Sequence, residues 1–207
     1  MKPARIIIFA KAPQAGFAKT RLIPVLGEQG AADLARRMLH HTLQAAIDAN
    51  VGTVELCVTP DITVPAWRDI LLPQGIEITA QGEGDLGARL ARAAQRAIGQ
   101  GERVLLIGTD CVEMSAQLLE EAKERLLDQD AIIHCTTDGG YALLGLNRFD
   151  AALFENMPWS TDAVAVDTLQ RLAHLGWSTH VGQMLNDVDE PQDLKWLPQN
   201  WRVFAPV

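Results

Sequence analysis

Short apolar runs alternate with longer segments of helical periodicity along most of this chain, and this alternation limits the folds open to it. The apolar runs are rich in Ile, Val and Leu and show little polar alternation, which is typical of strands covered on both faces. They lie at residues 5–10, 53–59, 77–80, 103–108 and 131–136. Between them, apolar residues recur at helical spacing within residues 34–47, 86–97 and 118–126. A β-α-β-α order predicts a parallel sheet with right-handed crossovers.

The pattern changes after residue 136. Asp138-Gly139-Gly140 supplies turn residues that tolerate a positive φ, and an apolar run, residues 141–146, follows. We therefore expect a reversal and a pairing strand, which makes the sheet mixed. Ser160-Thr161-Asp162 offers N-cap residues for a helix to about Leu175, which Gly176 would end. The expected fold is a Rossmann-like three-layer α/β sandwich with a mostly parallel mixed sheet.

Composition and charge narrow the class of protein. The 207 residues are 48% hydrophobic, enough to bury the core of one domain, so we expect a single domain over residues 1–207. The formal net charge of −8 argues against a nucleic-acid or anionic-membrane partner, because both require a basic surface. No apolar run approaches the ~18 residues of a membrane span. The three cysteines form no Cys-x-x-Cys pair, which argues against a cysteine zinc site and favours a cytoplasmic protein.

A cationic loop follows the first predicted strand. It carries Lys11, Lys19 and Arg21, and Gly16 between them lets the backbone approach a ligand closely. Ligands of open α/β sheets bind at the carboxyl ends of the strands. Cations gathered at such an end of an acidic protein indicate a phosphate site, and a solvated basic loop is the alternative. This is not a Walker A loop, because it contains no Gly-Lys-Thr.

A second loop, residues 82–87, matches the dinucleotide fingerprint Gly-x-Gly-x-x-Gly between a strand and a helix. An NAD(P)-type oxidoreductase is therefore an alternative. Glu83 and Asp85, however, would place two carboxylates where a pyrophosphate must lie. We expect instead a tight turn whose amides line a nucleotide pocket, with Leu86 and Leu90 anchoring the next helix.

Carboxylates at two places are candidate ligands for a hard divalent cation. Asp110 follows a buried strand at the expected crevice, and Ser115 is the better cap for the next helix. Asp187 and Asp189 would project alike in an extended segment. Mg²⁺ in proteins takes one or two carboxylates together with waters and substrate phosphates. Asp110 with a second acid from this segment predicts a site for a nucleoside triphosphate or a diphospho-sugar.

Three further residues have alternative interpretations. His134 and Cys135 resemble metal ligands, but they lie within an apolar strand and are expected in the core. Trp159 stands beside a polar loop, so a ligand-stacking role stays open for it beside simple packing.

An ordered set of motifs runs through almost the whole chain. In order these are Lys11-Ala12-Pro13 with Gly16 and Lys19-Thr20-Arg21-Leu22, Gly84-Asp85-Leu86-Gly87 with Arg89, Gly108-Thr109-Asp110-Cys111, Asp138-Gly139-Gly140-Tyr141, Pro158-Trp159-Ser160-Thr161, and Asp187-Val188-Asp189 with Asp193-Leu194. The set resembles the small bacterial glycosyltransferase-like family of the GT-A type, sometimes associated with arsenosugar biosynthesis. It is also similar to the guanylyltransferases that act on 2-phospholactate or the molybdenum cofactor. The resemblance implies a nucleotide-diphospho-sugar transferase fold.

The resemblance also implies roles for single residues. The first loop would grip phosphates, the segment from Gly84 to Arg89 would line the base or ribose, and two acids would bind Mg²⁺ or Mn²⁺. Residues of the later motifs would face the acceptor or sugar. The residues concerned are Lys11, Gly16, Lys19, Thr20 and Arg21 for phosphate, Gly84, Leu86, Gly87 and Arg89 for the nucleoside, Asp110 and Asp189 for metal, and Asp138, Gly139, Gly140 and Trp159 for acceptor or sugar. The chain departs from the family pattern at residues 112–114, at residues 134–137 and at Glu190.

Together these features predict a metal-dependent transferase that takes a nucleotide-sugar and a small-molecule acceptor. Lys19, Asp110 and Asp138 are the candidate catalytic residues, with Asp138 as the base for the acceptor hydroxyl or, alternatively, only a turn cap. The phosphates would be neutralised by the loop cations while the metal sits on the leaving diphosphate. Nucleotidyl transfer to a small phosphorylated or carboxylate acceptor stays open, as does a non-catalytic nucleotide-binding protein.

Overall fold

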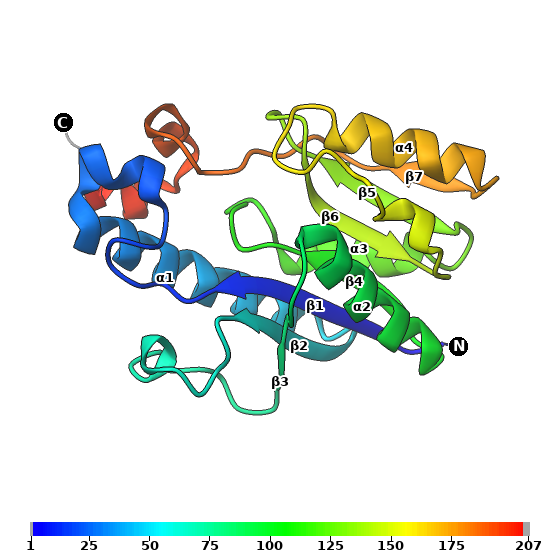
Figure 1. Cartoon of the computed structure of the whole chain (residues 1–207), viewed down its shortest axis with the longest axis horizontal. Coiled ribbons are helices and arrows are strands. Elements are labelled where there is room, and N and C mark those ends of the chain that lie inside the picture. Colours follow the sequence, from blue (N-terminus) through cyan, green and yellow to red (C-terminus); the bar gives the residue numbers. More distant parts are fainter. Residues whose placement is uncertain (1, 205–207) are drawn as a thin grey trace.

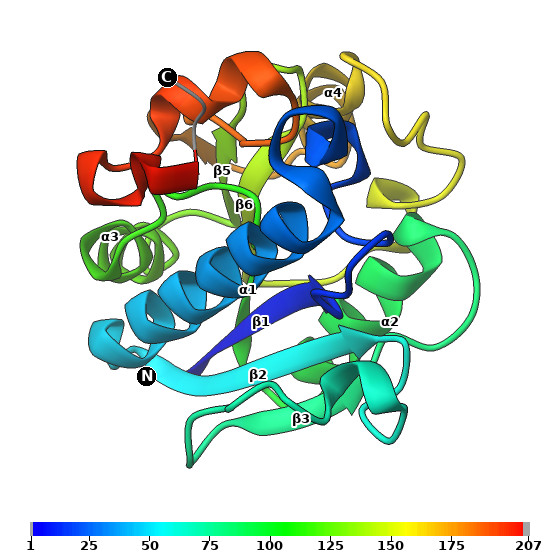
Figure 2. The same cartoon turned by 90° about the vertical axis from the view of Figure 1, so that its left-hand side faces the viewer.

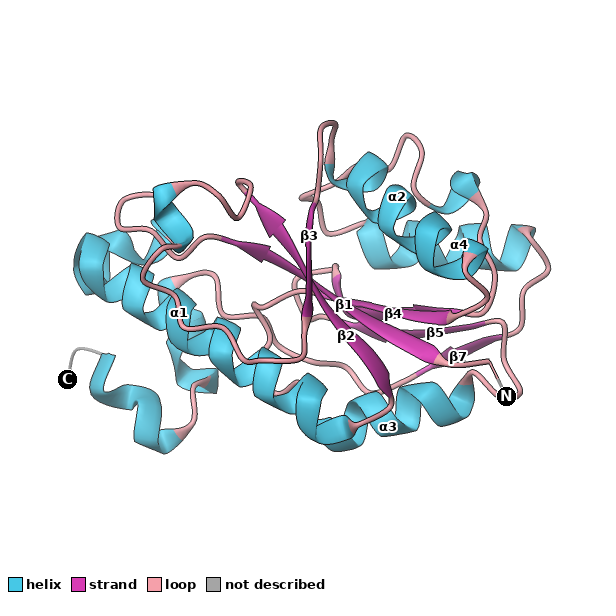
Figure 3. Ribbon diagram, turned by 90° about the horizontal axis from the view of Figure 1, so that it is seen from below, coloured by secondary structure: helices cyan, strands magenta, loops and turns pink. Residues whose placement is uncertain are grey.

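The computed structural model describes residues 2–204 and contains one seven-stranded sheet between two layers of helices (Figures 1 and 3). The strand order is β3-β2-β1-β4-β6-β5-β7. Strand β6 runs antiparallel to both of its neighbours, and the other pairs are parallel. The strands are β1 (Ala4–Lys11), β2 (Gly52–Thr59), β3 (Glu77–Ala80), β4 (Arg103–Ile107), β5 (Ala131–Cys135), β6 (Tyr141–Leu146) and β7 (Thr179–Val181). The expected α/β class with a mostly parallel mixed sheet is confirmed.

Within residues 2–204, four α-helices cover the two faces of the sheet. They are α1 (Ile23–Ala49), α2 (Leu86–Gly99), α3 (Ala116–Arg125) and α4 (Val164–His174). Because successive residues of a strand point to opposite faces, Ile6 and Ile8 of β1 pack with α1 and α3, whereas Ile7 packs with α2 and α4. Figure 3 shows these two helix layers below and above the sheet. Short 3₁₀ helices lie at Thr20–Leu22, Pro65–Trp67, Ala151–Leu153, Pro191–Trp196 and Gln199–Phe204.

The predicted strands are all present, with ends within one residue of those expected. Strand β7 was not predicted, because its three residues are half-buried or exposed and too short to carry a periodic signal. It pairs in parallel with β5. His134 lies in the core as expected, 2% exposed, and its Nδ1 donates to the carbonyl of Gln183 at 3.1 Å.

The expected cap of α4 is wrong, whereas two other expected helix ends are confirmed. The hydroxyl of Thr161 donates to the Pro158 carbonyl at 2.7 Å, and Ala163 occupies the N-cap position without a side-chain bond. The amide of Ala165 instead donates to the Gly139 carbonyl at 2.8 Å, so the turn before β6 caps this helix. Ser115 Oγ accepts from the amide of Leu118 at 3.3 Å and begins α3 as predicted. Gly176, with φ of +67°, follows the end of α4.

The last part of the described chain returns to the first loop. Val188, Leu194, Leu197 and Trp201 pack in one apolar cluster with residues of α1 and of the 3₁₀ helix before it. In Figure 2 this C-terminal arm, residues 185–201, is orange to red and lies beside α1 and α3. Among the described residues, no helix combines the length and the apolar character that a bilayer span requires.

Candidate active site

A cleft of about 800 Å³ lies at the edge of the sheet where β1, β2 and β4 end. Strand β6 runs in the opposite direction, so its first residue, Tyr141, lies at the same edge and also lines the cleft. The rest of the wall includes residues of the first loop, α1, the start of α2, the loop before α4 and the C-terminal arm. Parallel α/β sheets bind ligands at this edge, so the cleft is the candidate active site.

Most of the residues predicted for the site line this one cleft. These are Lys11, Lys19, Thr20, Arg21, Leu86, Asp110, Asp138, Gly140, Trp159 and Asp189. The structure does not bring the other predicted residues to its wall. Those are Gly16, Gly84 and Gly139, which lie in loops at positive φ, and Gly87 and Arg89, which belong to α2.

The first loop is a compact turn rather than a free basic loop. The amides of Phe17 and Ala18 both donate to the Gln14 carbonyl, and Gly16 takes the positive φ of +78° that the turn requires. Lys11 Nζ donates to the Phe17 carbonyl at 2.9 Å, which folds its side chain back along the loop. Arg21 is 67% exposed, and its Nη1 lies 4.0 Å from a carboxylate oxygen of Glu190.

Lys19 joins the two predicted metal ligands. Its ammonium donates to Oδ1 of Asp110, to Oδ1 of Asp189 at 2.8 Å and to the Val188 carbonyl at 2.8 Å. The amide of Val188 also donates to the Asp110 carbonyl at 2.9 Å, which ties the arm to the end of β4. An ammonium has three N–H donors, so these three acceptors use all of them. In this arrangement Lys19 has no donor left for a phosphate, unlike the role predicted from sequence.

Burial and charge shift the pKa values of several cleft residues. Burial lowers the pKa of Lys19, but the carboxylates of Asp110 and Asp189 outweigh it and raise this pKa above its ordinary value. Burial, followed by repulsion from Asp110, Asp138 and Asp189, raises the pKa of Asp187 to about 8. Burial raises the pKa of the Cys111 thiol to about 12, so this thiol is protonated at neutral pH and is not a nucleophile.

The oxygen atoms around the Lys19 ammonium suit a hard divalent cation. Two carboxylates and one backbone carbonyl meet at a single point, and Mg²⁺ and Mn²⁺ prefer such oxygen ligands. Within residues 2–204, no three His, Cys, Asp or Glu side chains are grouped to hold a metal ion by themselves. The donor set therefore fits a cation that shares its coordination with substrate phosphates.

Asp138 is oriented by the turn that precedes β6. Its Oδ1 accepts hydrogen bonds from the Gly140 amide at 3.1 Å and from the Thr136 hydroxyl at 2.5 Å. The turn-capping role considered from sequence is therefore present. Its Oδ2 accepts no hydrogen bond from the described residues, so the same side chain keeps one oxygen for chemistry in the cleft.

The start of α2 packs against Trp159. A Cβ atom on Gly87 would lie 2.4 Å from the Phe154 carbonyl oxygen and 2.7 Å from Trp159 Nε1, so only glycine permits this approach. Trp159 lines the cleft, and its buried Nε1 has no hydrogen-bond partner among the described residues. Leu86 is 43% exposed at the cleft wall, whereas Leu90 is buried, so only Leu90 anchors the helix as expected.

Hydrogen bonds from two arginines of α2 hold the loop before this helix, and Asp85 caps the helix. Arg89 Nε donates to the Gly84 carbonyl at 2.9 Å, and Arg92 donates to the carbonyls of Gln81 and Glu83. Asp85 Oδ1 accepts from the Ala88 amide at 2.8 Å and caps the helix. A dinucleotide pyrophosphate would need this N-terminus, so its occupation by Asp85 argues against NAD(P) binding. Of residues 81–85, only Gln81 lines the cleft. The amides of this turn therefore do not line the pocket as expected.

Two further cleft residues are Gln81, which was not predicted, and Asp187, which the sequence offered beside Asp189 as the second acid but to which the family resemblance gave no role. Gln81 Nε2 donates to the carbonyls of Ala10 at 3.2 Å and Cys57 at 3.0 Å, which joins the ends of β1 and β2. Asp187 lies two residues before Asp189 and faces the same cleft. The alternation in Asp187-Val188-Asp189 was a signal for Asp187, but no pattern in the sequence singles out Gln81.

The overall fold is similar to those of solved transferase structures. A proposed nucleotide-diphospho-sugar transferase from Desulfovibrio desulfuricans G20 has 31% identity and a TM-score of 0.88, over 97% of this chain and 88% of that one. The 4-diphosphocytidyl-2C-methyl-D-erythritol synthase of Anaerococcus prevotii DSM 20548 has 15% identity and a TM-score of 0.61, over 94% of each chain. Rv0371c from Mycobacterium tuberculosis H37Rv, in complex with manganese, has 16% identity and a TM-score of 0.56, over 95% and 98%. The nucleotide-diphospho-sugar transferase fold is confirmed, and it is a fold of glycosyl- and nucleotidyltransferase enzymes.

The chain belongs to the DUF2064 family, whose model is described as an uncharacterized protein conserved in bacteria and matches residues 42–161. This range contains Asp110, Asp138 and Trp159, whereas the first loop and Asp189 lie outside it. A search of curated proteins found no match.

Proposed function

We propose that this protein is a transferase that uses a nucleotide-sugar donor and a divalent cation, Mg²⁺ or Mn²⁺, and transfers the sugar to a small-molecule acceptor. The observation that carries the proposal is the convergence of Asp110 and Asp189, from distant segments, in the cleft that also contains the cationic first loop. A diphosphate needs both kinds of partner, since loop cations and a carboxylate-held metal share its charge. The similarity to the Desulfovibrio protein supports the donor class, and the manganese complex of Rv0371c supports the cation.

Residues of the first loop would bind the outer phosphate oxygens. Arg21 is exposed at the cleft, and its guanidinium can form paired bonds to phosphate. The Lys11 ammonium donates one hydrogen bond to the Phe17 carbonyl, which leaves two of its N–H donors for phosphate. Asp110 and Asp189 would hold the cation through oxygens that face the cleft. When bound, the cation supplies charge stabilisation to the departing diphosphate.

Asp138 is the proposed base. In sugar transfer, the bond between the sugar C1 and the phosphate oxygen breaks, and the electron pair leaves with the nucleoside diphosphate. The acceptor oxygen forms the new bond to C1, and its proton passes to Asp138. Oδ1 of Asp138 is held by the turn, which orients Oδ2 for this proton.

The charge distribution in the cleft favours an uncharged acceptor. Within the described residues, all Lys and Arg side chains that line the cleft belong to the first loop. The turn before β6 and the loop before α4 contribute instead the carboxylates of Asp138 and Asp162 to the wall. A phosphorylated or carboxylate acceptor would be repelled there, whereas a hydroxyl group could donate to these oxygens. This distribution supports glycosyl transfer over nucleotidyl transfer.

Nucleotidyl transfer is the second candidate, because one structure with this fold is a 4-diphosphocytidyl-2C-methyl-D-erythritol synthase. The two reactions break different bonds and so release different products. Glycosyl transfer releases a nucleoside diphosphate, and nucleotidyl transfer from a nucleoside triphosphate releases pyrophosphate. Assays for these two products in the same reaction mixtures separate the candidates.

Ligand-dependent thermal stability tests the proposal. UDP-glucose, GDP-mannose, GTP, CTP and NADH are each added at millimolar concentration, with and without Mg²⁺. Stabilisation follows the ratio of ligand concentration to Kd, so even weak donors raise the Tm. We expect a sugar nucleotide to give a metal-dependent shift that Asp110→Asn abolishes. Asp69→Asn, at an exposed position outside the cleft, should leave the shift intact.

Asp138→Asn separates binding, measured as the thermal shift, from chemistry, measured as the turnover rate. It should retain the metal-dependent thermal shift and lower kcat by roughly 10²-fold or more, because it removes a general base. A shift only with NADH, or one that Asp110→Asn leaves unchanged, contradicts the proposal. Binding of donors without turnover across neutral hydroxyl acceptors favours the non-catalytic alternative.

A further inference from the structure

The ammonium of Lys19 is the most constrained cation in the cleft. Its side chain is 7% exposed, whereas those of Asp110 and Asp189 are 47% and 38% exposed. Lys19 also adopts a left-handed backbone conformation, with φ of +46°, at the start of the short 3₁₀ helix that leads into α1. The fold therefore directs this side chain inward, beneath the two carboxylates.

The bonds of Lys19 occupy the oxygens that would hold a cation. Oδ1 of each aspartate and the Val188 carbonyl oxygen all accept from the single ammonium. A divalent cation that used these same oxygens would have to displace it. A cation that used the outer carboxylate oxygens would lie within a few ångströms of its positive charge and be repelled. In both cases Lys19 opposes the binding of a free metal ion.

We propose that Lys19 is a built-in counter-cation of the carboxylate pair, which keeps a free divalent cation from binding and admits the cation together with nucleotide phosphates. This inference rests on the proposed function and adds a binding order to it. The pair of aspartates with Lys19 carries a net charge of about −1, which is weak attraction for a free divalent ion. Nucleotide phosphates bring the missing negative charge and offer Lys19 new acceptors. The metal–nucleotide complex is then the true ligand of the cleft.

Mn²⁺ binding provides a direct test without any activity assay. Free Mn²⁺ is measured by electron paramagnetic resonance during titration of the wild type and of Lys19→Met, in the absence of nucleotide. Met fills similar space without charge or donors. We expect Lys19→Met to bind one Mn²⁺ at least tenfold more tightly than the wild type. The double variant Lys19→Met/Asp110→Asn should lose this gain, which would place the gained ion on the carboxylate pair.

Two variants control for charge and for the general field of the cleft. Lys19→Arg keeps a positive charge at the position and should leave Mn²⁺ affinity close to that of the wild type. Lys11→Met removes one positive charge from the same cleft, but its ammonium contacts a carbonyl and not a carboxylate. It should change Mn²⁺ affinity by less than threefold. Circular dichroism checks that each variant is folded, and Lys19→Gln replaces Lys19→Met if the latter is not.

The outcomes separate this inference from the proposed function. Equal or weaker Mn²⁺ binding by the folded Lys19→Met or Lys19→Gln variant contradicts the inference, because a merely structural lysine would only disorder the ligands. The titration is then repeated with UDP-glucose and with CTP, each compared with the same nucleotide without protein because nucleotides bind Mn²⁺ themselves. Mn²⁺ uptake by the wild type that requires a nucleotide supports the binding order. No uptake by the wild type with either nucleotide contradicts both the metal in the proposed function and the binding order, whereas tight Mn²⁺ binding by Lys19→Met in the same series still supports the electrostatic role of Lys19.

Discussion

At the scale of single residues, the turn at residues 138–140 shows how one glycine shapes the backbone around Asp138, the proposed base. Gly139 has φ of +92°, and a Cβ atom there would lie 2.1 Å from the Asp162 carbonyl oxygen. Its amide donates to the Thr136 carbonyl, and its own carbonyl caps α4 through Ala165. The residue contributes no functional group, yet it sets the direction of Asp138 and brings the loop before α4 to the cleft.

Gly139→Ala tests this close approach. The substitution should lower the free energy of unfolding by about 2–4 kcal/mol, because it adds backbone strain at positive φ to a clash with backbone atoms. Gly101→Ala is the matched control, since Gly101 has φ of +82° but a Cβ there would meet nothing within 4 Å. That control should cost only about 1 kcal/mol of strain. Urea unfolding measures both, and equal losses would show that the contact with Asp162 is unimportant.

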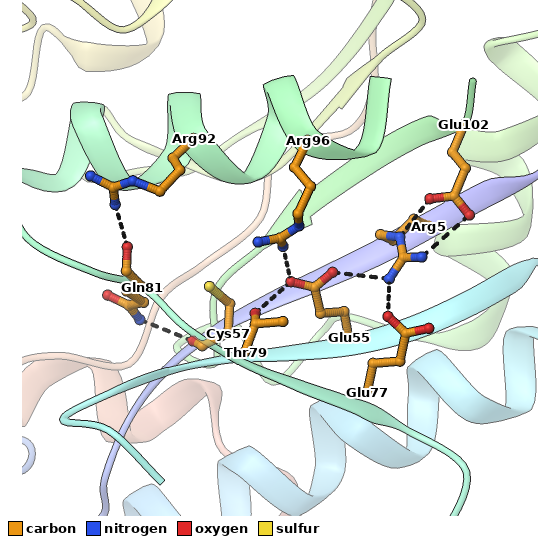
Figure 4. A network of polar contacts seen from close by, with 9 residues as sticks. All are labelled: Arg5, Glu55, Cys57, Glu77, Thr79, Gln81, Arg92, Arg96 and Glu102. Atoms are coloured by element: carbon orange, nitrogen blue, oxygen red, sulfur yellow. Dashed lines mark hydrogen bonds and ion pairs between the residues drawn. The ribbon is translucent and has the colours of Figure 1, made fainter. Parts of the chain in front are cut away.

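At the scale of secondary-structure elements, a buried ion network holds β1, β2, β3 and α2 together (Figure 4). Glu55 is fully buried and accepts from Arg5 Nη1 at 3.0 Å, from Thr79 Oγ1 at 2.6 Å and from Arg96. Arg5 also pairs with Glu77 and Glu102. Arg5 and Glu77 lie near the amino ends of their strands, so the network stands at the edge of the sheet away from the cleft.

Glu55→Ala should destabilise the fold without removing the site. It leaves Arg5 and Arg96 without their buried partner, and breaking a buried ion pair in this way costs about 3–5 kcal/mol. Glu121→Ala breaks an exposed pair with Arg125 and should change stability by less than about 1 kcal/mol. Urea unfolding gives both values. The donor should still raise the Tm of Glu55→Ala from its lowered value. A decrease of less than about 1 kcal/mol in the free energy of unfolding of Glu55→Ala would contradict the role of the network.

At the scale of the whole molecule, the C-terminal arm completes the cleft from outside the sheet. Asp189 meets Asp110 at the Lys19 ammonium, and the preceding residue, Val188, packs with Leu194, Trp201 and residues of α1. Trp201 is 8% exposed, contacts the His41 ring edge-on at 5.4 Å, and lies under the Arg37 guanidinium at 4.5 Å. The position of this carboxylate thus depends on the apolar packing of the C-terminal arm against α1.

Trp201→Ala should weaken ligand binding from a distance. Removing this side chain loosens the arm that carries Asp189, so we expect metal-dependent donor affinity to fall by about tenfold and stability by about 3 kcal/mol. Trp196→Ala is the matched control, because Trp196 belongs to the same arm but is 40% exposed. Isothermal titration calorimetry well below the Tm measures affinity. Unchanged affinity in folded Trp201→Ala would show that the arm holds Asp189 without this packing.

Much of the fold was predictable because the signals are local. Runs of Ile, Val and Leu predicted β1 to β6, and Ser115 and Gly176 predicted two helix ends. The cap of α4 was not predictable in this way, because the Gly139 carbonyl supplies it from a separate segment. Strand β7 also depends on its partner, since its three residues acquire strand character only by pairing with β5.

The order of strands and helices, the charge of the first loop and the acids that follow β4 are properties of neighbouring residues, and they point to a phosphate-binding α/β protein. Which of those charges lie together in the cleft depends on tertiary contacts between distant segments. Lys19 meets Asp110 and Asp189 across 91 and 170 positions, and the ammonium lies between the carboxylates rather than at the loop surface. Sequence patterns such as side-chain periodicity reflect residues that are close along the chain. The three N–H donors of the Lys19 ammonium instead bind acceptors that the folded sheet and the C-terminal arm place within about 3 Å of it. The tertiary structure therefore decided which charges oppose one another in the cleft.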